Sequence, residues 1–173
     1  MTKIKVSKTD AARRQIDCAI KLWINDDDPV SIHTLAFSAF SIVDDINVKR
    51  GNKDVTLQGL TETLAEPEHL TEVMQRMRAP MTFFKHANRD PHAILEFDSQ
   101  VNEFVLLFTV NGFQQLGEQL TDAQNTFIRW MTLHHPNLLK DGESAFPELG
   151  DKQIEGEALM RTVTKRQFFD NFL

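Results

Sequence analysis

Cysteine and tyrosine are the residues that this sequence lacks most clearly. Its 173 residues contain one cysteine, Cys18, which cannot form an intrachain disulfide. A reducing cytoplasm is the expectation that follows. Cys18 falls near the apolar stripe of the first predicted helix, so we expect it to be buried there as a small hydrophobic side chain. With 13 Phe and no Tyr, the aromatic core has no ring hydroxyls that need hydrogen-bond partners.

Long apolar runs and an excess of positive charge are also missing. No stretch approaches the ~20 residues of a membrane-spanning helix, and the first residues contain no apolar segment typical of a secretory signal. The formal net charge is −6. That charge makes nucleic acid an unfavourable partner, because a nucleic-acid surface needs clustered Lys and Arg. We expect a cytoplasmic protein that does not enter a membrane.

The sequence contains none of the short motifs that are typical of three common kinds of enzyme or metal site. The chain contains no Gly-rich phosphate loop, no Gly-x-Ser-x-Gly sequence and no paired-cysteine zinc motif. The sequence therefore predicts no cofactor, and a site must be sought among isolated polar residues.

What the chain does contain is apolar residues at helical spacing along most of its length. Helix-start and helix-stop signals divide this pattern into seven segments. The predicted helices cover residues 8–25, 28–50, 66–80, 81–90, 99–119, 121–135 and 153–170. Residues 51–66 are polar and predict a mobile loop, residues 92–97 alternate weakly and could be extended, and residues 137–152 predict a connector.

These segments predict an all-α fold. The helix at 99–119 is apolar nearly all round, which is typical of a helix buried on most sides. We therefore expect a single domain, residues 1–173, built as a bundle of six or seven helices around this central one.

Two stretches carry the candidate binding residues. The first, residues 28–46, has His33 and Asp44 on one helix face but about 16 Å apart along the axis, so they cannot share a metal ion. The second, residues 85–92, is KHANRDPH and contributes His86, Arg89, Asp90 and His92. These four residues could form an anion site. The alternative is ordinary helix-terminus and turn chemistry.

Both His33 and His86 lie beside apolar stripes. We expect both rings to point into the bundle near one end, each satisfied separately by its own partner. In that case they are structural. If they instead converge with an acid such as Asp90 or Glu96, a pocket becomes the better interpretation, and His33 or His86 could serve a metal-binding bundle.

The chain shows two family resemblances. The stretches DAARRQIDCAIKLW, DPVSIHTLAFSAF and FFKHANRDP resemble a set of bacterial all-helical proteins of similar length with no assigned activity. The layout of the first two helices also resembles HEPN bundles. In that family Arg and His are separated by four to six residues, as Arg129 and His134 are here, although Trp130 stands where the family usually has a polar residue. The resemblance implies a dimeric, metal-independent ribonuclease that uses Arg129 and His134.

The function that we expect is that of a binding or interaction protein without catalysis of its own. Phe168, Phe169, Phe172 and Leu173 crowd the C-terminal segment, which would otherwise expose them. This crowding predicts self-association or a protein partner. The HEPN-like ribonuclease and the metal-binding bundle are the two alternatives.

Overall fold

A computed structural model describes residues 3–52, 70–88, 90–135 and 153–172, which form seven helices and no strand. The predicted all-α fold is therefore confirmed. The chain divides into two compact units, residues 1–119 and 120–173, and each is described by itself. The single-domain assignment stays a prediction. The predicted connector at 137–152 and nearly all of the predicted 51–66 loop lie outside the described residues.

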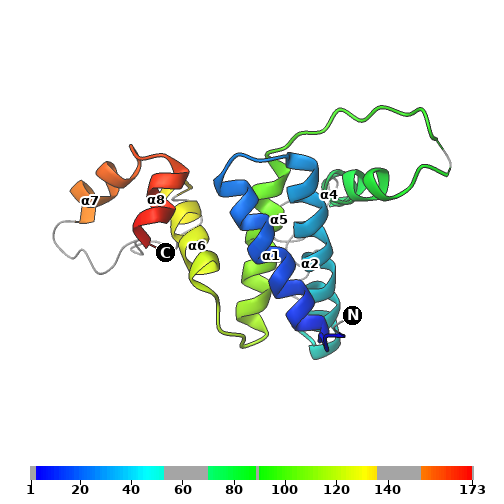
Figure 1. The fold of residues 1–173 in the computed structure, drawn as a ribbon, viewed down its shortest axis with the longest axis horizontal. Helices are drawn as coiled ribbons and strands as arrows, with labels where there is room; N and C mark the ends of the chain where they lie inside the picture. Colours follow the sequence, from blue (N-terminus) through cyan, green and yellow to red (C-terminus); the bar gives the residue numbers. More distant parts are fainter. Residues whose placement is uncertain (1–2, 53–69, 89, 136–152, 173) are drawn as a thin grey trace. The chain divides into compact units, whose positions relative to one another are not determined.

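The first unit is a bundle of α1 (Lys8–Ile24), α2 (Pro29–Arg50) and α5 (Val101–Gln115), with α4 (Leu70–Lys85) against α2. Figure 1 shows α1, α2 and α5 side by side, with α2 and α5 running in the same direction. The apolar stripes of the three helices meet in the core. Its fully buried members are Ala12, Ile16, Ala19, Ile20, Ala36, Ala39, Val105, Leu106, Val110 and Phe113.

Local capping fixes where the helices begin and end. Ser7 and Asp10 form a capping box at the start of α1. Asp28 accepts a hydrogen bond of 2.8 Å from the Ser31 N–H, with Pro29 in the first turn of α2. Gly51 ends α2 in the left-handed conformation, φ 82°.

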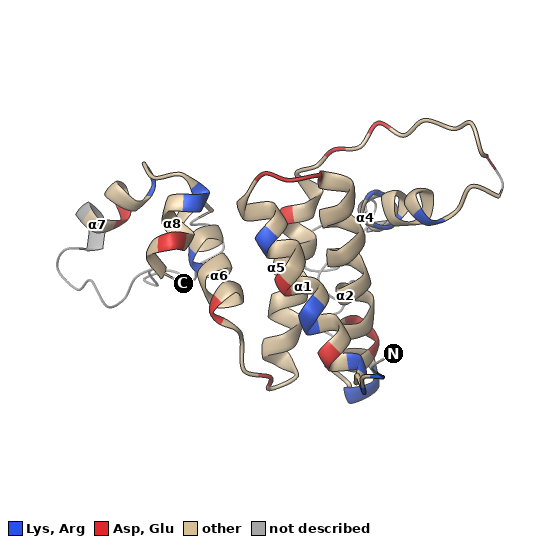
Figure 2. Cartoon of the chain, viewed as in Figure 1, with Lys and Arg blue, Asp and Glu red and all other residues tan. Residues whose placement is uncertain are grey.

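The predicted central helix is α5, which carries a single charged residue, Glu103 (Figure 2). Its backbone approaches α2 so closely that a Cβ added to Gly112 would lie 2.5 Å from Val43 Cγ1. Asn47 closes the same contact, because its side-chain amide donates to the Gly112 carbonyl at 3.1 Å. Asn52 in turn donates to Asn47 Oδ1 at 3.0 Å.

The second unit contains α6 (Asp122–His134), α7 (Gln153–Met160) and α8 (Lys165–Phe172). Phe168 and Phe169 are 0% and 1% exposed, and Trp130 of α6 packs edge-on against Phe168 at 5.3 Å between ring centroids. The expectation that the C-terminal phenylalanines would be exposed is therefore wrong for these two rings. They are buried within the chain and give no reason to infer self-association.

Three local predictions need correction. Pro80, which is expected to kink or end its helix, does not end it: the helix continues to Lys85, so the two helices predicted at 66–80 and 81–90 are one. The segment predicted as one helix at 153–170 is two, because Thr164 and Gln167 form a capping box that starts α8. Cys18 is exposed rather than buried.

No helix in the described ranges has the length and apolar character needed to cross a membrane.

We expect Gly112→Ala to destabilise the first unit by about 1–3 kcal/mol, because the added methyl group must displace a β-branched side chain in a packed interface. Chemical denaturation of the variant measures this loss, with Gln114→Ala, an exposed site on α5, as the control. The double variant with Val43→Ala should lose less stability than the sum of the losses in the two single variants. Full additivity would contradict a direct clash between the two residues.

Candidate functional site

His33 lies fully buried between α2 and α5. Its Nδ1 is 2.9 Å from Asn102 Oδ1, and the Asn102 side-chain amide donates to the Pro29 carbonyl at 3.0 Å. Because Asn102 uses its NH₂ group on Pro29, its oxygen faces the ring, and His33 Nδ1 must carry the proton that it donates. This chain of hydrogen bonds joins the N-terminal ends of α2 and α5.

The other side of the His33 ring faces aromatic residues. Phe37 stacks on it at 5.7 Å between centroids, and Phe84 and Phe97 approach edge-on at 5.8 and 5.2 Å. Its Nε2 is buried and has no hydrogen-bond partner. Burial lowers the pKa of His33, and the hydrogen bond with Asn102 opposes that shift. The ring is therefore neutral at neutral pH, with a lone pair enclosed by apolar groups.

The remaining predicted binding residues do not gather around His33. Asp44 is half-buried further along α2, Asp90 and His92 are exposed in a turn after α4, and Arg89 lies outside the described residues. His86 is exposed as well, so the expectation that it points into the bundle is wrong. The helix ends at Lys85, and the chain leaves the apolar stripe on which His86 was placed.

The parts of the chain that the structure describes contain no cluster of side chains that could form a metal site. No group of three or more His, Cys, Asp or Glu side chains there could hold an ion. The hydrogen-bond partner of His33 Nδ1 is the neutral side-chain amide of Asn102, and the His33 ring also contacts Phe84 and Phe97.

Arg129 and His134 both lie on α6, but they leave the helix in directions about 140° apart. The His134 ring packs against Trp130 at 4.0 Å between centroids, and its Nε2 is buried without a hydrogen-bond partner. Burial lowers the pKa of His134, and the neighbouring charges of His135 and Arg161 lower it further. Within one chain this arrangement does not aim both side chains at a single phosphate.

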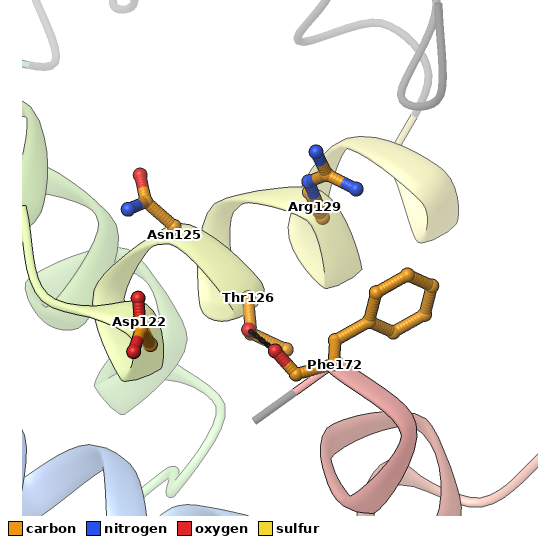
Figure 3. Close-up of a pocket in the computed structure, with 5 residues that line it drawn as sticks. All are labelled: Asp122, Asn125, Thr126, Arg129 and Phe172. Carbon is orange, nitrogen blue, oxygen red and sulfur yellow. Dashed lines mark hydrogen bonds between the residues drawn. The ribbon is translucent and has the colours of Figure 1, made fainter. Parts of the chain in front are cut away.

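Arg129 instead lines a pocket of about 360 Å³ (Figure 3). Its other walls are Asp122, Asn125 and Thr126 of α6 and Phe172 at the end of α8. The spacing i, i+3, i+4 and i+7 places the four α6 side chains on one helix face. The guanidinium carbon of Arg129 lies 5.8 Å from the centre of the Phe172 ring. The Thr126 hydroxyl donates to the Phe172 carbonyl at 3.5 Å.

This pocket can recognise a molecule by charge and by hydrogen bonds. The guanidinium of Arg129 can grip a carboxylate through two parallel hydrogen bonds. Asn125 offers both a donor and an acceptor, and Asp122 is an acceptor for cations and N–H groups. The volume falls at the low end of small-molecule sites, which range from about 300 to 1,000 Å³.

Sequence reasoning missed Asn102 and most of the pocket. Asn102 is a polar residue in the first turn of a mainly apolar helix, and its position there is a signal that could have marked a buried partner for a histidine. For the pocket, the signal was the polar stripe at residues 122, 125, 126 and 129. Only Arg129 was singled out, for its spacing from His134.

We expect the stability of the protein to fall as the pH drops below about 6.5. The pKa of His33 is lower in the folded state than in the unfolded chain. As the pH falls, the unfolded chain therefore binds the proton first, and this proton binding shifts the equilibrium toward unfolding. The slope is at most about 1.4 kcal/mol per pH unit for this residue. His33→Asn keeps a donor toward Asn102 but cannot titrate, so it should reduce the slope while lowering stability at neutral pH. The slope that remains includes His134, whose pKa is also lowered by burial.

Urea denaturation at several values between about pH 7.5 and pH 5 measures this slope. The control is His86→Asn, which removes an exposed histidine. An equal loss of slope in both variants would contradict the assignment to His33.

Comparison with known proteins leaves the family resemblances as predictions. No protein-family model matches this chain, and neither a curated protein nor a solved structure matches it.

Proposed function

We propose that this protein is a helical binding protein without catalysis of its own, and that the pocket on α6 carries the binding. The observation behind the proposal is the pocket lining. Asp122, Asn125, Thr126 and Arg129 present hydrogen-bonding groups of both charges on one face of one helix, and Phe172 closes the site with an aromatic wall. Binding sites of small molecules combine a few placed polar groups with apolar surface in this way.

Two features of the pocket favour recognition of a ligand. Arg129 is held over the Phe172 ring, and a guanidinium supported on an aromatic face loses less freedom when it grips a ligand. Thr126 is tied to the Phe172 carbonyl, which fixes the wall against the helix. Both contacts orient the pocket before a ligand arrives, and such preorganisation raises affinity.

The HEPN-like ribonuclease is the second candidate, and the place of Arg129 in a solvent-accessible pocket is the observation that favours it. His134 argues against it, because its Nε2 is buried against Trp130 rather than facing the same pocket. A general base has to reach the proton that it removes.

We expect small charged molecules to perturb the pocket in NMR spectra of the full chain. The probes are acetate, ethylammonium and glycine at millimolar concentration. At least one should shift the backbone amides of residues 122–129, and Arg129→Gln should reduce the shifts of any anionic or zwitterionic probe. Arg166→Gln, which changes an exposed arginine of α8, is the matched control. Unchanged spectra with all three probes would contradict the proposed binding function.

A single-stranded RNA substrate tests the second candidate. If the chain is a binding protein, we expect RNA to remain intact without added metal. Cleavage that is lost in both His134→Ala and Arg129→Gln would replace the proposed function with the ribonuclease. Cleavage that persists in both variants would come from a contaminating nuclease.

A further inference from the structure

We propose that the α6 pocket takes a short free peptide of two or three residues, with its ammonium group at Asp122 and its carboxylate at Arg129. The inference rests on the proposed binding function and names its ligand class.

The charges of the pocket lie at its two ends. Asp122 and Arg129 are seven residues apart on α6, a rise of about 10.5 Å along the helix axis. A simple anion drawn to Arg129 also meets the negative charge of Asp122, and a simple cation at Asp122 meets Arg129. A molecule with a positive and a negative end is attracted to both.

The length of the pocket selects among zwitterions. An extended chain advances about 3.3–3.6 Å per residue, so about three residues span the rise between the two charged positions. Because the side chains of Asp122 and Arg129 can bend toward each other, a peptide of two residues can also contact both. A longer protein segment does not offer both groups at this spacing, since its free ammonium and free carboxylate stand at opposite ends of a long chain.

The middle of the pocket suits a peptide group. The Asn125 side chain provides one donor group and one acceptor, which is what a backbone carbonyl and N–H require. Thr126 is only 3% exposed and its hydroxyl donates to the Phe172 carbonyl, so it shapes the pocket wall and leaves the ligand's peptide group to Asn125. Phe172 adds an apolar wall for the ligand's methylene groups.

Asp122 also has a structural role, because it is the acidic residue in the first turn of α6 and stabilises that end of the helix. Replacing it changes the helix as well as the pocket. The decisive changes are therefore made in the ligand, which leaves the folded protein untouched.

The experiment titrates the full chain with triglycine, N-acetyltriglycine and triglycinamide and follows the amides of residues 122–129 and 168–172 by NMR. Triglycine should bind, and each cap, which removes one charge, should weaken binding about three- to fivefold, as expected for one exposed ion pair. In Asp122→Asn, triglycine and N-acetyltriglycine should bind equally. Asp170→Asn, at an exposed site on α8, should preserve the difference.

Equal binding of the capped and free peptides would overturn the zwitterion, while the pocket's binding function stands. Failure of all three peptides to bind also overturns it, and the response to acetate, ethylammonium and glycine then shows whether the pocket binds other molecules. If those probes fail as well, both proposals fall.

Discussion

The close approach of α2 and α5 at Gly112 is the contact on which the first unit depends. Gly112 contributes no side chain to the contact, and the Val43 side chain of α2 occupies the space that a Cβ would need. Backbones that come this close bring the Gly112 carbonyl within 3.1 Å of the Asn47 amide. Asn47 thus makes a buried polar contact across a mainly apolar interface, and this pairing fixes the register of the two helices.

A second polar connection joins the same two helices at their other ends. His33 and Asn102 pair there, and Asn102 also reaches the Pro29 carbonyl. A one-residue slip of either helix would leave these buried groups without partners, at a cost of about 1–3 kcal/mol each. The histidine that stands out in the sequence thus acts in the packing of α2 on α5. Phe84 and Phe97 complete its surroundings and hold α4 and the segment before α5 to the same place.

The sequence predicts what is decided locally. The capping residues Ser7, Asp28 and Gly51 act within a few residues of themselves, and the helix ends that they set agree with the prediction. The local cost of a proline predicts a kink or an end of the helix, yet Pro80 lies buried within α4 beside Met77 and Met81, where tertiary packing can outweigh that cost. The burial of Phe168 and the pairing of His33 with Asn102 also depend on contacts between segments far apart in sequence. Residue spacing does not contain that information.

Two histidines with a buried Nε2 atom and two charged residues of the α6 pocket differ in their surroundings. The Nε2 atoms of His33 and His134 are both buried, each beside aromatic rings. On α6, the His134 ring packs against Trp130 and leaves the helix about 140° away from Arg129. Asp122 and Arg129 line that pocket, where they can attract and orient a charged molecule. On α6 the pocket is thus lined by a carboxylate and a guanidinium, while the imidazole of His134 packs against Trp130.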